Sequence, residues 1–391
     1  MFVQKSMDTK ERICTYALSR IFRNEPKVAK AIIDTLGSAS TIFEMDSDSL
    51  TELMGPYNRH RESISQADIG SYEKELDRAL DGGGRYLIYK DEGFPEILGE
   101  CPDAPVGFFY KSGSAPADVF GRESIAVVGT RNITPYGAHW CRNIVASLAH
   151  SDTRPTIVSG LAYGVDITAH LTALESGLPT IAVLGTGITN IYPSAHTRHA
   201  QRIMETPGCA IICEHPDMDE VYASNFLSRN RIIAGLCRAT VLIESKLKGG
   251  GMHTARMAAS YNRMAFALPG RNDDPYSQGC NYLIQSHIAE PIIGCDEFFH
   301  TLDYTLGAEG GKGQPQSLAD FYSGSMDSGK IELCQRLYVL ICAERGISIG
   351  QLAQSTGCAY AQVASALQRM ENDGFIDIDL IQRCSATRKK P

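Results

Sequence analysis

Two arginines in one short segment, residues 228–236 (SRNRIIAGL), are the strongest chemical signal in the sequence. We expect Arg229, Asn230 and Arg231 near the start of a helix, where the positive end of the helix dipole disfavours a cation unless an anion is bound. The alternative use of one arginine is an internal salt bridge, with Glu214 or Glu244 near a strand end. The segment therefore predicts a phosphate site in which at least one arginine takes part.

A second candidate loop follows a buried apolar run and contains Gly129, Thr130 and Arg131. Gly129 lets the backbone turn and approach a ligand, while Thr134 and Pro135 can cap and open the next helix. Unpaired N–H groups at such a helix start attract phosphate. Arg131 at the apex of the loop suits an external phosphate.

The loop after the next apolar run contains Ser159 and Gly160 and leads into a helix that carries Asp166 and His170. These two side chains are four residues apart on one helical face, which could serve acid/base chemistry or a metal. The alternative, which we favour, is that Asp166 caps the helix and His170 packs beneath it.

A further loop contains Tyr192 and leads to Arg198. Tyr192 could stack on a base and Arg198 could pair with a phosphate. An equal alternative is that Tyr192 is a buried anchor.

The last candidate loop, residues 246–251 (KLKGGG), combines a lysine pair with three glycines. Exposed N–H groups beside ammonium groups form an anion-binding concavity, for which Lys248, Gly249 and Gly250 are the candidates. Alone, a triple-glycine loop is a weak signal.

Motifs for a cofactor or a metal are missing from the sequence. The loop at Gly129 lacks the G-x-G-x-x-G of a dinucleotide site, and no G-x-x-x-x-G-K-[ST] occurs for a nucleoside triphosphate. The twelve cysteines are scattered singly, without the spacing of a zinc module. We therefore expect no cofactor and no metal.

The elements that must position these loops are short β-branched runs alternating with helical patterns between residues 124 and 269. Such alternation predicts a doubly wound, mainly parallel α/β sheet covered on both faces, an extended Rossmann-like fold. The carboxyl ends of parallel strands meet at one edge of the sheet, which brings the loops together. The runs are residues 125–128, 156–158, 180–184, 210–212, 240–243 and 265–268.

Four segments are expected along the 391 residues. Residues 1–80 show short amphipathic helices, and residues 81–304 form the α/β domain with its core at 122–292, approached through a Gly/Pro-rich stretch at 81–105. Residues 305–330 have the composition of a flexible linker, and residues 331–391 predict a winged helix. The third helix of that module offers Gln362, Gln368 and Arg369 but few cations, so we expect it to contact protein rather than DNA.

The net charge of −8 argues against a protein that coats duplex DNA by bulk positive charge, so a nucleic-acid site must be a local patch. No apolar stretch approaches the roughly 18 residues of a membrane span. We expect a soluble, cytoplasmic protein with reduced thiols and no membrane partner.

Taken in order, the candidate motifs resemble the DNA processing protein A family (DprA/Smf) over residues 86–292. The matching runs are AVVGTR at 126–131, VSGLA at 158–162 with Gly164 and Asp166, GTG at 185–187 with Tyr192-Pro193, RNRIIAG at 229–235, and Pro269-Gly270 with Gly279. The resemblance implies a homodimer that binds single-stranded DNA in a basic pocket without catalysis. It also implies that the DNA is protected and passed to the RecA recombinase in natural transformation.

By this resemblance, phosphate contacts fall on one set of residues. The set is Gly129, Thr130, Arg131, Ser159, Gly160, Arg198, Arg229, Asn230, Arg231, Lys248, Gly249 and Gly250. The N-terminal segment is similar to the family's small helical SAM or helix-hairpin-helix-like domain.

The sequence departs from the family pattern at a few positions. Leu227 stands where proline is usual, His196 where asparagine is usual, and Gly249 and Gly251 where serines are usual. The glycine-rich hairpin expected after the first helix is replaced by residues 24–26 (NEP).

Two competing functions remain open. Phosphoribohydrolases of a related fold carry a P-G-G-x-G-T-x-x-E loop, but residues 249–258 here contain Thr254 and no glutamate. The second is an adaptor whose basic loops are merely solvated.

Overall fold

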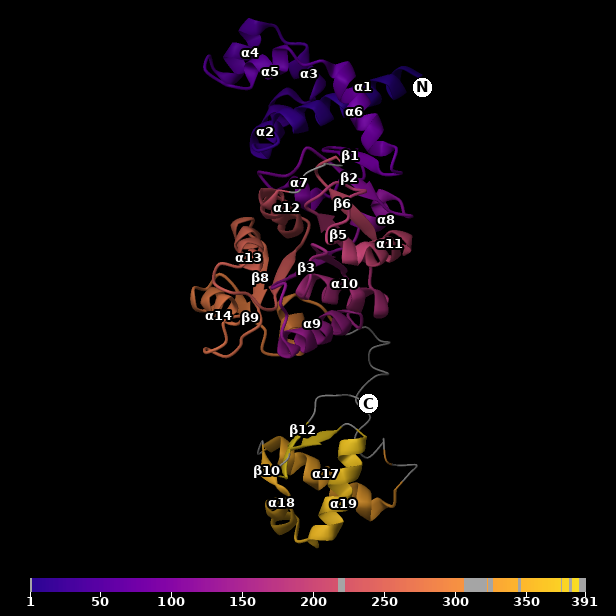
Figure 1. Cartoon of the computed structure of the whole chain (residues 1–391), viewed down its shortest axis with the longest axis vertical. Helices are drawn as coiled ribbons and strands as arrows, with labels where there is room; N and C mark the ends of the chain where they lie inside the picture. The colour runs from indigo at the N-terminus through magenta and orange to yellow at the C-terminus, as the bar shows by residue number, and fades with distance from the viewer. Residues whose placement is uncertain are drawn as a thin grey trace. The chain divides into compact units, whose positions relative to one another are not determined.

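The computed structural model describes residues 2–216, 222–305, 322, 326–343, 346–373, 375–379 and 382–386. The chain divides into two compact units, Met1–Thr305 and Leu306–Pro391 (Figure 1). Most of the predicted linker lies outside the described residues. The boundary expected near residue 80 falls inside the first unit and stays a prediction.

The first unit is built on a nine-stranded sheet in the order β1-β2-β6-β5-β4-β3-β7-β8-β9. All pairings from β6 to β9 are parallel, which confirms the predicted α/β sheet. The strands are β1 Arg85–Ile88, β2 Gly107–Lys111, β3 Ser124–Val128, β4 Thr156–Ser159, β5 Thr180–Leu184, β6 Ala210–Cys213, β7 Ala239–Leu242, β8 Met264–Ala267 and β9 Glu290–Pro291.

Residues 81–105 were expected to contain only turns leading to the α/β domain, but β1 lies within this stretch and β2 directly after it. They pair with each other, and β2 with β6, in antiparallel fashion, so the sheet extends to this edge. The glycines and prolines there belong to the turns, while Tyr86, Phe108 and Phe109 are buried.

Alternate residues of the strands feed two cores, one on each face of the sheet. Ala126 and Val128 belong to one core and Ile125 and Val127 to the other, as expected for a strand covered on both sides. One face is covered by α7 Glu96–Gly99, α8 Pro116–Phe120, α12 Ala223–Gly235, α13 Gly250–Ser260 and α14 Gln278–Gln285. The other carries α9 Pro135–Leu148, α10 Val165–Glu175, α15 Cys295–Thr301 and, after the 3₁₀ turn η1 Ser194–His196, α11 Thr197–Glu205.

The N-terminal helices form their own small core and also pack on the sheet edge. Tyr16 in the first helix contacts Tyr86 edge-on at 5.4 Å and Phe109 at 6.0 Å between ring centroids. The helices are α1 Phe2–Ile21, α2 Pro26–Leu36, α3 Ser40–Phe43, α4 Ser47–Met54, α5 Arg61–Ser65 and α6 Ile69–Leu80. This arrangement packs α1 and α6 against β1 and β2.

Among its described residues, the second unit shows the helices α17, α18 and α19 and a small antiparallel sheet, elements of the kind predicted for a winged helix. Its elements are α17 Ser328–Ala343, β10 Ile347–Ser348, α18 Ile349–Thr356, α19 Tyr360–Asn372, β11 Ile376–Ile378 and β12 Arg383–Ala386. Helix α18 begins with a capping box in which Ser348 and Gln351 satisfy each other's backbone N–H groups.

The strand order reverses beside β3, which pairs with β4 on one side and β7 on the other. In open α/β sheets, ligands bind outside the carboxyl ends of the strands at such a switch point. The loops after β3 and β7 are those that carry Arg131 and the lysine pair.

Candidate nucleic-acid interface

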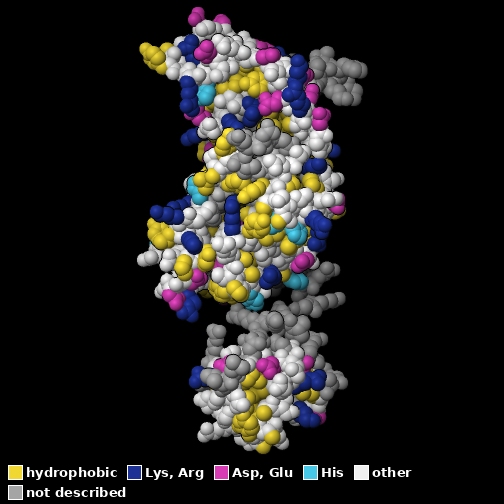
Figure 2. Space-filling model, viewed as in Figure 1, with side chains coloured by type: hydrophobic (Ala, Val, Ile, Leu, Met, Phe, Trp, Pro, Cys, Tyr) yellow, Lys and Arg dark blue, Asp and Glu magenta, His cyan; other side chains and the backbone are white. Residues whose placement is uncertain are grey.

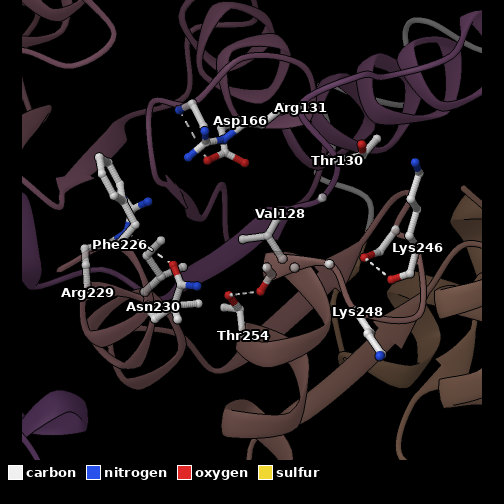
Figure 3. A pocket seen from close by; sticks show the side chains of 18 of the residues that line it. Val128, Thr130, Arg131, Asp166, Phe226, Arg229, Asn230, Lys246, Lys248 and Thr254 are labelled. Carbon is white, nitrogen blue, oxygen red and sulfur yellow. Dashed lines mark hydrogen bonds between the residues drawn. The ribbon is translucent and has the colours of Figure 1, made fainter. Parts of the chain in front are cut away.

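A pocket of about 860 Å³ opens at this switch point (Figure 3). Its walls come from the loops after β3, β4 and β7 and from helices α12 and α13. In Figure 3, Arg131 and Asp166 lie on one side, Phe226 and Arg229 on a second, and Lys246 and Lys248 on a third. The structure thus brings together side chains that are more than 100 residues apart in the sequence.

The loop that carries Arg131 is fixed by hydrogen bonds to the neighbouring strand end. Thr130 N donates to the Glu244 carbonyl at 2.7 Å, and Thr134 N donates to the Glu244 carboxylate at 2.9 Å. Thr134 also caps α9, as predicted, by accepting from Gly137 N. Glu244 is therefore bound by this loop and not by an arginine, while the exposed Arg131 guanidinium lies over the Phe226 ring at 5.7 Å.

Arg229 does not lie at a helix start, which corrects the prediction. Helix α12 begins at Ala223, so Arg229 lies in its second turn, only 7 % exposed. Its guanidinium donates to the carbonyl of Gly160, at 2.9 Å, and to that of Val183. Arg229 thus ties α12 to the ends of β4 and β5 while one edge still lines the pocket.

Asp166 supplies the opposite charge to Arg229. Burial raises the pKa of the Asp166 carboxyl, and the nearby Arg229 charge and the N–H groups of Ala162 and Gly160 act against that shift. Burial also lowers the pKa of Arg229 to about 10, so its guanidinium keeps its charge at neutral pH. Asp166 was expected to cap α10, but the helix begins at Val165 and its N-cap is Gly164. Asp166 instead holds the loop before α10 through its bonds to Gly160 and Ala162.

His170 is fully buried beneath α10, as favoured from the sequence. Thr180 Oγ1 donates to the Ile157 carbonyl at 2.7 Å, so it accepts from His170 Nδ1–H, also at 2.7 Å. Burial lowers the pKa of His170 to about 3, so the ring is neutral. The part of the chain that the structure describes contains no group of three His, Cys, Asp or Glu residues arranged for a metal ion.

Four of the predicted contact residues lie outside the pocket lining. Gly160 lines a small adjoining cleft, and its carbonyl accepts from Arg229. Arg231 forms a buried salt bridge with Glu214, the alternative foreseen for one arginine. Ser159 is buried and donates to the Val127 carbonyl at 2.6 Å. Arg198 is exposed on the first turn of α11.

The lysine loop leads directly into α13, whose N-cap is Gly249 and whose first residue is Gly250. Lys246 and Lys248 are exposed, and Lys246 Nζ lies 5.0 Å from the centre of the Tyr276 ring. Nothing stands within 4 Å of the position a Gly250 Cβ would occupy, so the backbone there is open to a ligand. Free N–H groups at a helix start beside two ammonium groups suit an anion.

The lining contains four cationic residues, Arg131, Arg229, Lys246 and Lys248, and one acidic residue, Asp166. The pocket is therefore positive in a chain of net charge −8. On the face shown in Figure 2, Lys and Arg side chains are dispersed among acidic and hydrophobic ones, without one broad basic face. The positive charge that could bind a polyanion is thus confined to the pocket, as expected for a chain whose net charge is negative.

Residues 85–303 match the family of DNA recombination-mediator protein A, from the first strand of the sheet to the end of α15. The match spans more than half of the chain. The chain belongs to this family.

Known members of the DNA recombination-mediator protein A family are similar over much of their length. A putative DNA processing protein DprA from Mycobacterium tuberculosis (strain CDC 1551 / Oshkosh) is 30 % identical over 322 residues, which cover 78 % of this chain and 79 % of that protein. The DNA processing protein DprA of Streptococcus pneumoniae (strain ATCC BAA-255 / R6) is 38 % identical over 195 residues, covering 50 % of this chain and 66 % of that protein. The X-ray structure of the Streptococcus pneumoniae protein superposes with a TM-score of 0.62 at 29 % identity, covering 73 % of this chain and 95 % of that chain.

Within this recombination-mediator fold, the departures noted in the sequence fall near the pocket. Leu227 lines the pocket and is half exposed. His196 is buried and donates from Nδ1 to the Leu161 carbonyl at 2.8 Å.

Besides Tyr192, which was a stacking candidate, the pocket contains aromatic and polar residues that were not among the predicted contacts. Phe226 and Tyr276 line it, as do Asn132 and Lys246. Tyr276 has no motif around it and reaches the site only because residues 269–277 fold back beside β7, where Ser245 N donates to the Tyr276 carbonyl at 2.6 Å. The sequence contained one indication for Phe226, because it directly precedes Leu227, which stands where the family usually has proline.

Proposed function

We propose that this protein binds single-stranded DNA in the pocket at the switch point and does not catalyse a reaction. The observation that carries the proposal is a local positive pocket whose rim combines Arg131, Lys246 and Lys248 with accessible aromatic rings. Lys and Arg neutralise the backbone phosphates, and aromatic rings stack on unpaired bases whatever their identity.

The aromatic rings favour single-stranded over duplex DNA. Tyr192 is 44 % exposed, with its ring centroid 5.4 Å from that of Phe226, which in turn lies under Arg131. Base faces are available for stacking only when the bases are unpaired. A duplex could offer this pocket its phosphates but not its bases.

The groups that could support acid/base catalysis are engaged in holding the loops. Asp166 accepts two backbone N–H groups, and neutral His170 is buried against Thr180. The phosphoribohydrolase alternative needs a glutamate shortly after Thr254, which residues 249–258 lack, and Asp166 is the one acid in the described lining. Release of free base from a nucleoside monophosphate, followed by chromatography, would revive that alternative.

Family membership supports a wider role. We infer that the protein protects incoming single-stranded DNA in the cytoplasm and loads the RecA recombinase onto it during natural transformation, acting as a homodimer. Light scattering tests the dimer. The lag before RecA filaments form on single-stranded DNA, with and without this protein, tests the loading.

Fluorescence anisotropy of a labelled dT oligonucleotide, titrated at several salt concentrations with unlabelled duplex as competitor, tests the binding. Arg131→Ala should weaken binding and lower the slope of log K against log salt by about 0.7, the value for one lost single-strand contact. Arg142→Ala, which removes an exposed arginine from α9 outside the pocket, is the matched control and should leave both unchanged.

Two outcomes would contradict the proposal. If the wild type shows no salt-dependent binding, the pocket does not serve nucleic acid. If Arg131→Ala and Arg142→Ala bind alike, the basic loops are merely solvated and the adaptor function gains support.

A further inference from the structure

A second, small cleft of about 10 Å³ adjoins the pocket and contains one aromatic residue that the proposed site does not use. It shares Arg131, Ala162, Tyr192 and Phe226 with the pocket, and it adds Gly160, Tyr163 and Pro193. Tyr163 lies on the loop between β4 and α10 and is 48 % exposed. The two clefts therefore form one continuous surface in which the Tyr163 ring follows those of Phe226 and Tyr192.

The Tyr163 ring is held in place although it is exposed. It packs edge-on against His196 with 4.8 Å between ring centroids. His196 is itself fixed by its hydrogen bond to the Leu161 carbonyl, two residues before Tyr163 in the same loop. A ring that is already immobilised loses little conformational entropy when a base stacks on it.

The backbone of this loop has an unusual conformation on both sides of Tyr163. Leu161 has a φ of 58°, a left-handed conformation that is uncommon for a leucine, and Gly164 has a φ of 76°. An alanine Cβ at Gly164 would stand 2.3 Å from the Thr130 carbonyl oxygen, so the loop lies directly against the one that carries Arg131. Strained backbone of this kind tends to occur where a loop binds a ligand.

A cationic residue lies close in sequence to His196, the residue against which the Tyr163 ring packs. Arg198 is exposed on the first turn of α11, two residues after His196, outside the lining of either cleft. An aromatic ring followed by an arginine is the composition of a single-strand track, in which bases stack and phosphates are neutralised in turn.

We propose that Tyr163 is a base-stacking platform that extends the single-strand site beyond the pocket toward Arg198. This inference rests on the proposed single-strand binding and names where the strand continues. DNA long enough to leave the pocket places a base on Tyr163, whereas a shorter strand occupies the pocket alone. Tyr163 therefore sets the length of strand that the protein holds.

The test measures by anisotropy the affinity for labelled dT oligonucleotides between about 4 and about 16 nucleotides long. This range covers the lengths that single-strand binding sites contact, about 4 to about 16 nucleotides. Tyr163→Ala should bind the shortest oligonucleotides like wild type and the longer ones about tenfold more weakly, the loss expected for one stacked base. Tyr163→Phe keeps the ring face and should follow wild type at every length. Tyr57→Ala, which removes a tyrosine that is 97 % exposed on the loop between α4 and α5, is the control.

The outcomes separate this inference from the function on which it rests. If wild type gains affinity with length and Tyr163→Ala does not, the platform is supported. If Tyr163→Ala follows wild type throughout, or loses affinity equally at all lengths, the platform is refuted while binding in the pocket stands. If wild type binds no oligonucleotide, both proposals are overturned.

Discussion

Arg131 and Arg229 both line the pocket, but their guanidinium groups have different surroundings. Arg131 is exposed and contacts the face of Phe226, so its charge is available to a ligand. Arg229 is buried, bonded to two carbonyls and balanced by Asp166. We therefore expect Arg131 to act on binding and Arg229 to act mainly on folding.

Replacement of Arg229 by alanine should destabilise the protein. The change leaves the Gly160 and Val183 carbonyls without their donor and Asp166 without its compensating charge, at a cost of about 3 kcal/mol in the free energy of unfolding. Arg131→Ala should change that free energy by less than about 0.5 kcal/mol, because its side chain is at the surface. Urea denaturation of the two variants measures the difference, and equal values for both would show that Arg229 is not a structural residue.

Helix α10 is coupled to strand β5 through a histidine that must stay neutral. Burial lowers the pKa of His170 to about 3, below the ordinary value of about 6.5 that it has in the unfolded chain. The unfolded state therefore binds more protons between these values, and stability present above about pH 6.5 is lost as the pH falls toward 3. The raised pKa of Asp166 acts in the opposite sense, giving stability that is lost as the pH rises through its folded value.

Acidification from about pH 7 to about pH 5 should thus remove about 2 kcal/mol of the His170 contribution. His170→Asn keeps a donor toward Thr180 and does not titrate, so its free energy of unfolding should fall less than that of wild type by this amount. Urea denaturation at the two pH values measures the difference. Identical pH dependence in both proteins would mean that His170 takes up its proton in the folded state as readily as in the unfolded chain.

The start of α13 offers a matched pair of glycines. A Cβ on Gly251 would stand 2.6 Å from Leu242 Cδ1 and 3.1 Å from Gly129 Cα, whereas a Cβ on Gly250 would meet nothing within 4 Å. Gly251→Ala should separate the helix start from the β3 loop, costing about 1–3 kcal/mol and weakening DNA binding. Gly250→Ala should leave stability within about 1 kcal/mol. Thermal denaturation measures the stability of the two variants and anisotropy measures their DNA binding. Equal stability and equal binding would show that neither property depends on the close contact between Gly251 and Gly129.

At the level of elements, sequence periodicity predicted the strands that are buried on both faces but not those at the antiparallel edge. Runs such as residues 125–128 are continuous and apolar because helices cover both sides. Strands β1 and β2 are short and lie among turn residues, so their pairing became evident only in three dimensions. The start of α12 was misplaced because its N-cap, Tyr222, has no capping side chain bond and thus no signal in the sequence.

The candidate site was predictable to the extent that it depends on strand ends. The loops at Gly129 and Lys248 lie at the switch point as topology requires. Which arginine faces the pocket and which pairs with Glu214 depends on the rotation of α12, and that is set by packing rather than by local sequence. Tyr276 enters the pocket through a long-range contact, for which a single sequence contains no pattern.

At the scale of the whole molecule, the two units differ in what they offer to DNA. Every residue of the pocket lining lies between Val128 and Tyr276, in the first unit. In the second unit, α19 carries one arginine, Arg369, and its charge is paired with Asp373. The described wing carries the acid Asp379 after β11 and the exposed arginine Arg383 at the start of β12. The exposed Tyr360 of the second unit donates to Gln382 at 2.9 Å, next to the exposed Arg383, but among its described residues α19 itself offers only the paired Arg369.

A chain that ends after Thr305 should therefore bind single-stranded DNA as the full chain does. Because it keeps all the cations of the pocket and both clefts, its dissociation constant for a dT oligonucleotide should stay within about twofold and its salt slope should be unchanged. Anisotropy titrations of the full and shortened chains at several salt concentrations measure both quantities, with circular dichroism to show that the shortened chain is folded. A shallower salt slope in the shortened chain would mean that cations of the second unit contact the phosphates. An unchanged slope would instead leave α19 and the wing free to contact protein, the role that their few cations favour.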